Sequence, residues 1–550
     1  MVAYDRPRAS RLSRRILTLP LLLTLSLLAG AASVPRVEFE KLTLANGLQV
    51  ILHVDRKLPV VHVNQWFHVG SKNERAGRTG FAHLFEHMMF QGSKNASEDY
   101  FTYVGKAGAN LFAGGVNGTT ELDRTNYFAT VPSGSLEYLL WLESDRLATL
   151  ADALTQEKLD NQRNVVKNER RQSFENQPYG RAFKLVLENL YPQGHPYSWH
   201  VIGSHEDLTA ASLDDVREFF RTYYTPNNLS LVIAGDFDIA QAKQLVEKYF
   251  GSIPPGPALD RIERWIPELP GEKVVEATDR VAQERVYIAW PAPAYFEAAD
   301  AELQLASGIL TDGLASRLKK ALVYDRQLAS EVSSVAQPGE ISGLFAVVAS
   351  ARPGTSLSQI EQVVTQEIAR LATAGPTADE LQRVKAKIEY GFVSGLEDIG
   401  GFAGKAERLN MYNTYLGDPG RFDADLLRYR TASVASVRDA VDRWLNTRKR
   451  VVVRFHPEIS GRVSQVTLDR SQAPPLGADK PFAAPAVKSS KLPNGLEVFV
   501  VERTELPKVV VTLATRAGAT ADPDGRAGLA DMTASTLELG TKTRQALQIE

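Results

Sequence analysis

Three things are scarce in this 550-residue chain. It contains no cysteine and only nine histidines, and its formal net charge is −2. Without cysteine the chain forms no disulfide, and any zinc ion must be held by histidine and carboxylate side chains. A charge balance this close to zero gives no basis for binding nucleic acid, so partners of that class are not expected. The length is enough for more than one domain.

Long apolar runs are also rare, and the clearest one lies near the N-terminus. Several arginines precede the leucine-rich stretch 16–28, and small residues follow it at 29–31. This order predicts a secretory signal peptide over residues 1–33. The run is short for a membrane span, so no stable span is expected, although a retained anchor stays open as an alternative. We therefore expect an exported protein, periplasmic or extracellular.

Residues 83–87 read His-Leu-Phe-Glu-His, the most informative motif in the chain. His83 and His87 are four residues apart, so on a helix they lie on one face and both rings can reach one cation. Glu86 lies beside them, where it can act as a general base. The flanking residues are apolar on almost every side, which predicts a buried helix, and a buried cluster of this kind must be paired or metal-bound. A surface helix with two chance histidines fits those flanks poorly.

The order H-x-x-E-H is typical of the inverted zincins. Asn46-Gly47-Leu48 precedes the motif, and the run Arg163-Asn-Val-Val-Lys-Asn-Glu169 follows it. With these features the chain resembles the pitrilysin-type zinc peptidases, which include insulin-degrading enzyme and the mitochondrial processing peptidase. The resemblance extends from about residue 40 to the end of the chain.

The resemblance implies one zinc ion held by His83, His87 and Glu169, with Glu86 as the general base. Hydrolytic zinc usually has three protein ligands and one position for water. From the residues alone, Glu169 is one of several candidates for the third ligand; the others are Glu143, Glu157 and Glu175. Gln162 stands where many relatives carry a second glutamate that supports the site.

The segment Gly114–Thr120 resembles the substrate-binding edge of the same family, where a peptide adds as a strand. The residues that would bind substrate by this resemblance are Asn117, Gly118 and Thr119. On composition alone the segment fits equally well a loop that binds no ligand. Relatives also hold the substrate carbonyl with an Arg and a Tyr, but Val323 and Ser330 occupy those two positions here.

The remaining histidines do not form a recognisable ligand motif. His53, His62 and His68 fall in stretches that we expect to be strands. A second group falls in one loop-rich stretch and consists of His195, His200 and His205. We assign no metal site to either group.

The fold class expected is α+β. The resemblance implies repeated α/β-sandwich domains with antiparallel-rich sheets, helices packed on them, and an enclosed chamber. Stretches rich in Pro, Gly and Ala predict linkers at 254–271 and 471–488. The expected domains are a catalytic domain at 36–253, a second domain without metal at 272–470, and a third unit at 489–550.

Local patterns predict several elements within these domains. Strands are expected at 47–54, 60–69, 125–131, 229–234 and 450–455. Helices are expected at 137–150, 157–175, 213–224 and 436–445. Ser212-Leu-Asp-Asp215 has the form of a capping box at the start of one of these helices.

The chain also repeats itself. With a constant offset of 448 residues, Asn46–Gly92 aligns with Asn494–Gly540, and fourteen of the 47 positions are identical. A repeat of this length predicts two related halves. The three polar residues of the motif are replaced in the second copy by Asp531, Ala534 and Ser535. The metal site is therefore expected in the first copy alone.

The second copy stops just after its first helix, at Glu550. A hairpin and one helix cannot bury a core of their own. We therefore expect either a shortened version of a longer chain or an incomplete unit. A second half-chain or a homologous subunit is the expected partner, with low peptidase activity in its absence.

The function expected from all these features is that of an exported zinc endopeptidase acting on unfolded peptides or small proteins. Two alternatives stay open. The first is that the chain is a non-catalytic binding or assembly subunit of the same family. The second is that it is a zinc hydrolase of a non-peptide substrate. The intact set of His83, Glu86 and His87 disfavours the first alternative, and only the family resemblance disfavours the second.

Overall fold

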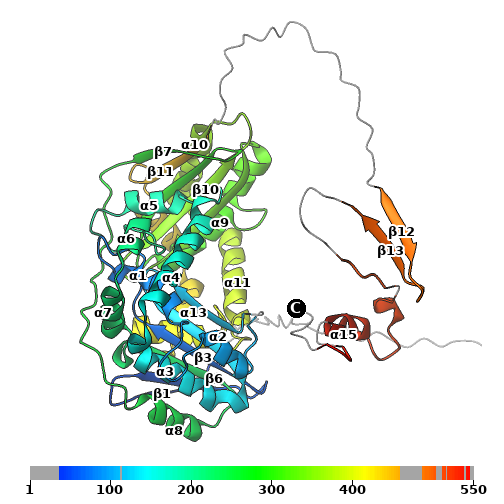
Figure 1. Cartoon of the computed structure of the whole chain (residues 1–550). Helices are drawn as coiled ribbons and strands as arrows, with labels where there is room; N and C mark the ends of the chain where they lie inside the picture. Colours follow the sequence, from blue (N-terminus) through cyan, green and yellow to red (C-terminus); the bar gives the residue numbers. More distant parts are fainter. Residues whose placement is uncertain are drawn as a thin grey trace, which may run out of the picture. The chain divides into compact units, whose positions relative to one another are not determined.

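A computed structural model of the chain describes residues 36–111, 114–458, 486–502, 511–515, 517–537 and 541–544. The chain divides into two compact units between residues 461 and 462 (Figure 1). The predicted signal peptide at 1–33 and most of the predicted linker at 471–488 lie outside the described residues. None of the described helices has the length and the hydropathy that a membrane crossing needs.

The first sheet has six strands in the order β1-β2-β6-β3-β5-β4. Its strands are β1 (Glu40–Thr43), β2 (Gln49–Val54), β3 (Val60–Phe67), β4 (Val116–Thr120), β5 (Thr125–Pro132) and β6 (Leu229–Gly235). Neighbouring strands are antiparallel except for β2 and β6, which are parallel. The strand β4 therefore lies at one edge of this sheet.

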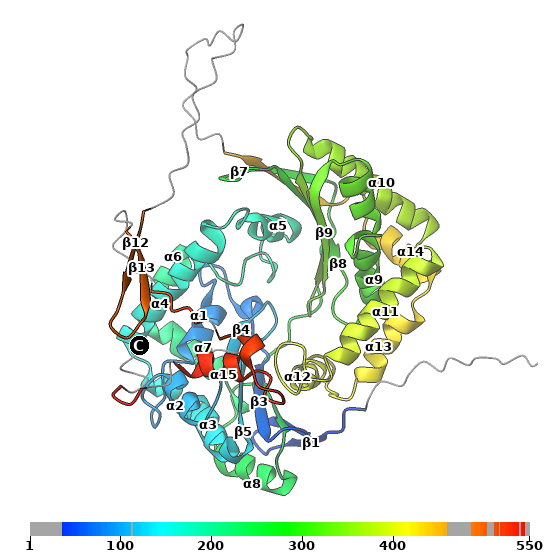
Figure 2. The same cartoon turned by 90° about the vertical axis from the view of Figure 1, so that its right-hand side faces the viewer.

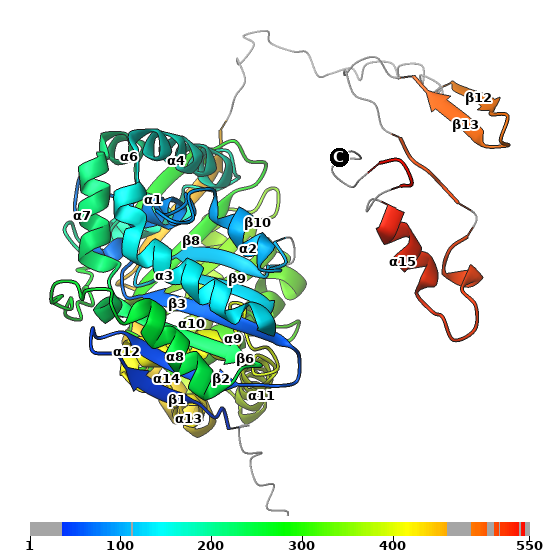
Figure 3. The ribbon, with the colours of Figure 1, turned by 60° about the horizontal axis from the view of Figure 1, so that its bottom comes forward.

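Helices cover one face of the first sheet (Figure 3). They are α1 (Phe81–Met88), α3 (Leu136–Ala153), α7 (Leu213–Tyr223) and α8 (Ile239–Phe250). Three further helices belong to the part of the first unit that is built on this sheet, which we call its first half. They are α2 (Tyr100–Lys106), α4 (Gln156–Arg170) and α6 (His205–Ala210). Apolar side chains from the sheet and from its helices form one continuous core, which confirms that the motif helix α1 is buried.

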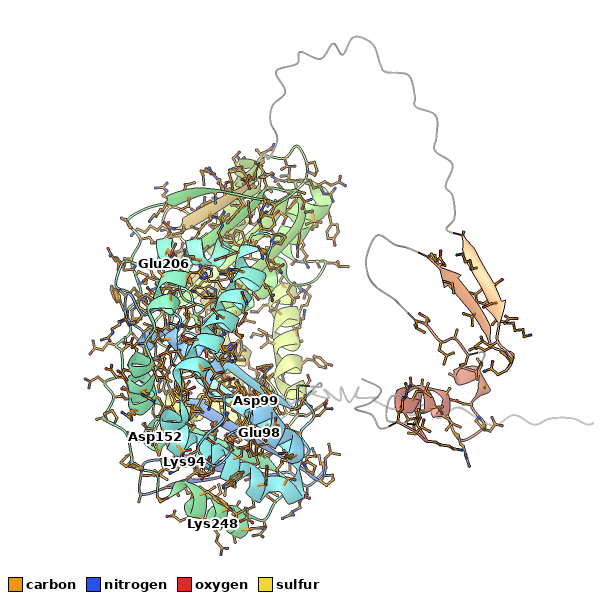
Figure 4. The ribbon with its side chains drawn as sticks, viewed as in Figure 1. Lys94, Glu98, Asp99, Asp152, Glu206 and Lys248 are labelled. Carbon is orange, nitrogen blue, oxygen red and sulfur yellow. The ribbon has the colours of Figure 1, made fainter. Side chains whose placement is uncertain are left out.

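Local polar contacts fix these helices at their ends and on their surface. The side chain of Asp99, labelled in Figure 4, accepts a hydrogen bond from a backbone N–H and caps α2. Ser212 and Asp215 form the predicted capping box of α7. Lys248, also labelled in Figure 4, pairs with Glu137 and joins α8 to α3 at 2.8 Å. Since this last pair is exposed, it contributes little to stability.

The second sheet has five strands in the order β7-β11-β8-β10-β9. They are β7 (Lys273–Asp279), β8 (Arg285–Ala292), β9 (Ala329–Gln337), β10 (Gly343–Ala351) and β11 (Val451–Pro457). All pairs are antiparallel except β7 with β11. Both sheets are thus mainly antiparallel, as predicted.

Helices lie along one face of the second sheet (Figure 2). Those that supply its core are α9 (Asp300–Thr311), α10 (Leu357–Ala374) and α14 (Val434–Trp444). Two more are α11 (Ala378–Ser394) and α13 (Phe422–Thr431). The arrangement confirms the α+β class, with helices packed on antiparallel-rich sheets.

The first unit thus has two halves, one built on each sheet. Each half places one helix against the sheet of the other half. Helix α5 (Ala182–Leu190) packs on β8 and β11, and α12 (Lys405–Leu416) packs on β3 and β6. The strand β6 shows the result, because Leu231 and Ile233 face the helices of their own half while Val232 and Ala234 face the side of α12. The central strands of each sheet are therefore covered on both faces, which explains why β6 is buried along its whole length.

Two expectations about local structure need correction. The helix predicted at 157–175 is α-helical only to Arg170 and continues as a π-helical stretch, Arg171–Glu175. His68 lies just beyond the end of β3 rather than on a strand. Wide turns of the π type recur at functional sites, and this one directly follows the helix that carries Glu169.

The second unit contains a hairpin and a helix. These elements are β12 (Val487–Lys491), β13 (Glu497–Val501) and α15 (Leu529–Thr536). They begin within one residue of the positions 448 residues after β1, β2 and α1. None of the described residues of this unit is buried.

Candidate metal centre

The helix α1 begins with a strict local geometry. Gly80 adopts a φ of +86°, and a Cβ atom at this position would lie 2.8 Å from the carbonyl oxygen of Ile202. The buried carboxylate of Glu74 accepts hydrogen bonds from the backbone N–H groups of Gly80, at 3.0 Å, and Ala82, at 2.8 Å. Glu74 therefore satisfies two of the free donors at the start of the helix and fixes its direction.

Three side chains converge beside this helix. His83 and His87 come from α1, and Glu169 comes from α4. One carboxylate oxygen of Glu169 lies 3.7 Å from Nε2 of His83 and 3.4 Å from Nε2 of His87. Among the described residues, these three form the one group whose ligand atoms all lie within 4.8 Å of one another and could hold a metal ion.

The spacing of these atoms fits a zinc ion. Two ligands bound to zinc at about 2.0–2.1 Å and at a tetrahedral angle lie about 3.4 Å apart. The distances of 3.4 and 3.7 Å are close to that value. Two neutral imidazoles and one carboxylate are also a usual donor set for zinc in hydrolases.

The orientation of His87 fits the same role. Its Nδ1 lies 3.3 Å from Oε1 of Gln162, which lies on α4 and is buried. Because an amide oxygen only accepts hydrogen bonds, Nδ1 carries a proton, and Nε2, which lies towards Glu169, is the nitrogen that can bind a metal once it has given up its own proton. Nδ1 of His83 is buried and has no hydrogen-bond partner among the described residues.

Burial and charge shift the titration of these groups. Burial, together with the nearby charge of His87, lowers the pKa of His83 to about 4, which keeps that ring neutral. Burial acts in the same direction on His87, but the hydrogen bond to Glu169 and the carboxylates nearby outweigh it and raise its pKa. The bond from His87 in turn lowers the pKa of Glu169.

Glu86 lies on the same helix and is buried, with 8% of its surface exposed. The hydroxyl group of Thr120 donates a hydrogen bond of 2.7 Å to Oε2 of Glu86. Burial raises the pKa of Glu86 above its ordinary value. A buried carboxylate with a raised pKa, held by one neutral donor, is suited to accept and return a proton.

The other glutamates considered for the third ligand are engaged or lie elsewhere. Glu143 is buried beside Arg146 and accepts a hydrogen bond from Tyr100 at 2.6 Å. Glu175 pairs with Arg170 and His205 at 3.0 and 2.9 Å. Glu157 lies exposed in the first turn of α4, three turns before Glu169.

The segment expected to bind substrate is β4, which contacts α1. Thr119 donates a hydrogen bond of 2.6 Å to Asn126, and Asn117 accepts one of 2.8 Å from the N–H of Gly118. A Cβ atom at Gly118 would lie 3.0 Å from the ring of Phe90, so this close packing needs glycine. The strand pairs with β5 on one side and with no other described strand, so its outer edge is unpaired.

One contact of this site, from Thr120 to Glu86, carries no local sequence signal. The sequence predicts Thr120 only as the end of the substrate segment, and not as the donor to Glu86.

The positions at which relatives carry the Arg and the Tyr lie in the second half of the unit. Val323 lies in a π-helical stretch (Lys319–Asp325), and Ser330 lies in β9.

Comparison with known proteins identifies the family of this chain. A family model described as Insulinase (Peptidase family M16) matches residues 49–203, and one described as Peptidase M16 inactive domain matches residues 210–388. The chain belongs to the pitrilysin-type peptidase family, M16. The resemblance predicted from the sequence is confirmed.

Individual M16 relatives match about two thirds of this chain. The zinc protease PqqE of Helicobacter pylori is 29% identical over 374 residues, which are 66% of this chain and 82% of that protein. A probable mitochondrial-processing peptidase subunit beta of Schizosaccharomyces pombe is 25% identical over 389 residues, 66% and 81% of the two chains.

A solved structure of a protease from Helicobacter pylori matches this M16 chain with a TM-score of 0.70 and 25% identity. The match covers 76% of this chain and all of that one. The first half of the periplasmic protease PqqL of Escherichia coli matches with a TM-score of 0.63 at 17% identity, over 77% and 93% of the two chains, which supports the fold alone.

Proposed function

We propose that this M16 chain is a zinc endopeptidase that hydrolyses peptide bonds in unfolded peptides or small proteins. His83, His87 and Glu169 would hold one zinc ion, and Glu86 would act as the general base. The observation that carries the proposal is the convergence of three donor atoms at a spacing suited to zinc, with a buried carboxylate beside them. Relatives named zinc proteases support the same reaction.

When bound, zinc would supply Lewis acidity, which acidifies water and polarises a carbonyl group. The chain's own residues supply the proton transfers. Glu86 removes a proton from the attacking water and later returns it to the leaving amine. Thr120 holds one oxygen of Glu86, so the other oxygen stays available for that proton. Gln162 keeps the ring of His87 in the tautomer that binds metal.

The substrate would lie along β4. The unpaired outer edge of this strand offers backbone donors and acceptors to an extended peptide, which would add as a further strand. Asn117, Gly118 and Thr119 are the residues we assign to this contact. Because only an extended segment pairs in this way, unfolded peptides are the expected substrates rather than folded proteins.

Two further parts of the proposal concern location and partner. The basic and apolar N-terminal sequence supports export, and N-terminal sequencing of the mature protein should begin near Ala32. An intact Met1 on the mature protein would contradict it. Exposed apolar side chains of the second unit, such as Phe499, Leu513 and Met532, support a homologous half or subunit as the partner that covers them.

Glu86→Gln tests the proposed function. The amide keeps the shape of the side chain but cannot accept a proton, so zinc content should stay at one ion per chain while kcat falls by about 10²–10⁴. Metal analysis and cleavage of an unfolded peptide measure the two quantities. Glu157→Gln, at an exposed position of α4, serves as the matched control and should behave like the wild type. Full turnover by Glu86→Gln would show that the assigned mechanism is wrong.

A further inference from the structure

The second half of the first unit inserts one carboxylate into the first sheet. Glu407 lies on α12 and is buried against the face of the sheet opposite α1 and α3. Its Oε2 accepts three hydrogen bonds, from Asn64 at 3.0 Å, Trp66 at 3.0 Å and Asn126 at 3.1 Å. Arg124 lies 3.8 Å from the other oxygen. A buried carboxylate with this many donors has one well-defined position.

Two of these partners continue the network towards β4. Asn126 accepts hydrogen bonds from Thr119, at 2.6 Å, and from Arg124, at 3.0 Å. Arg124 also donates to the backbone oxygen of Thr119 at 3.1 Å. Thr119 and Asn126 are paired directly across β4 and β5. The side chains that receive Glu407 therefore hold the main chain of β4 as well.

The next residue of the strand reaches the candidate metal centre. Thr120 follows Thr119 in β4 and donates the 2.7 Å hydrogen bond to Glu86. Successive residues of a strand point to opposite faces, so Thr119 faces the side of α12 while Thr120 faces α1. Any shift of Thr119 is carried by the backbone to Thr120, and so to the carboxylate of Glu86.

We propose that Glu407 is a positioning residue, which holds β4 and, through Thr120, the carboxylate of Glu86 in the geometry that the reaction needs. The inference rests on the proposed function for its effect on catalysis. It gives the second half of the unit a specific role in the site. Helix α12 fixes the position of the edge strand β4 from the face of the sheet opposite α1. Glu407 itself touches neither the three converging side chains nor the outer edge of β4.

The same helix offers a matched control. Lys405 is also buried on α12, and its Nζ pairs with Asp55 at 2.6 Å at the end of β2. In the sheet order, β2 is separated from β4 by three strands. Lys405→Ala and Glu407→Ala therefore each remove one buried charged contact between the two halves, but only the second contact leads to β4.

Four measurements separate positioning from a general loss of stability: zinc content, thermal stability, kcat/KM and amide hydrogen exchange. Both alanine variants should keep one zinc ion and lose similar amounts of thermal stability. Glu407→Ala should lower kcat/KM for an unfolded peptide at least about tenfold below Lys405→Ala, with kcat reduced and KM raised. Amide hydrogen exchange of residues 116–120 should become faster only in Glu407→Ala.

A conservative variant guards against simple misfolding. Glu407→Gln keeps one oxygen that can accept the bonds from Asn64, Trp66 and Asn126, so it should restore slow exchange in β4 and most of the activity. Equal kcat/KM and equal β4 exchange in Glu407→Ala and Lys405→Ala would overturn the inference, as would loss of zinc from Glu407→Ala alone. If the wild type cleaves no peptide, the proposed function fails, and the exchange measurement still decides whether Glu407 holds β4.

Discussion

Replacing Gln162 by leucine should weaken zinc binding without removing a ligand. In the wild type, Oε1 of Gln162 accepts a hydrogen bond of 3.3 Å from Nδ1 of His87. Loss of such an outer contact typically costs about 10–100-fold in metal affinity. This bond is longer than the usual 2.9–3.0 Å and its acceptor is neutral, so we expect the lower limit, about tenfold in Kd, or about 1.4 kcal/mol.

A competition titration between the protein and a zinc chelator of known affinity measures this change. Gln156→Leu is the matched control, because Gln156 lies exposed at the start of the same helix and bonds only to Asp160 in the described structure. It should leave the zinc Kd unchanged. Gln162→Glu should bind zinc at least as tightly as the wild type, because an ionised acceptor strengthens the bond from His87. An unchanged Kd in Gln162→Leu would refute the role assigned to Gln162.

Two further predictions concern the third ligand, Glu169, and an ion-paired contact between the two halves of the first unit, in which Glu340 pairs with His68 and Lys72. Glu169→Gln should lose most of its zinc while Glu175→Gln keeps it, and equal zinc content in both by metal analysis would exclude Glu169 as a ligand. Burial would raise the pKa of Glu340, but the bond from His68 and the charge of Lys72 lower it to about 2. Its contribution to stability is therefore complete above about pH 4.5 and is lost as the pH falls towards 2, so the acid decline of Tm should be smaller in Glu340→Gln.

The part of the site that the sequence predicts well lies within one helical turn. His83, Glu86 and His87 need only the spacing of a helix to come together, and the apolar flanks of the motif predict that the helix is buried. No comparable local rule selects Glu169. It lies on another helix, and several glutamates have the same local appearance, so the family resemblance rather than the pattern singled it out.

The sheets show the same limit. The mostly apolar stretch at 229–234 predicts a buried strand, and β6 is buried along its whole length. The run does not tell which helix covers its second face. That helix is α12, from the other half of the unit, and α5 covers the second sheet in return. Such exchanges depend on contacts between residues far apart in the chain, and local periodicity carries no information about them.

The helix α12 explains why a positioning residue in this fold escapes sequence reasoning. Its buried face includes Glu407, Asn410 and Asn413, at a spacing of three residues, where a helix packed on a sheet would ordinarily carry apolar side chains. Asn410 bonds to the backbone oxygen of Asn64 at 3.0 Å, and Asn413 bonds to Ser230 at 2.7 Å. In the sequence alone, polar residues at this spacing predict a helix face exposed to solvent.

The polar side chains of α12 have partners because the sheet is polar at the same place. Asn64, Trp66 and Asn126 point their donors away from α1 and towards α12, on the face of β3 and β5 opposite the motif helix. A polar contact of this kind fixes one relative position of helix and sheet, whereas apolar packing tolerates small shifts. We infer that the site needs this precision, because under the proposed function β4 would present its edge to a peptide while it holds Thr120 against Glu86. An apolar triple replacement of Glu407, Asn64 and Asn126 should therefore fold and bind zinc, yet cleave peptide more slowly than the wild type.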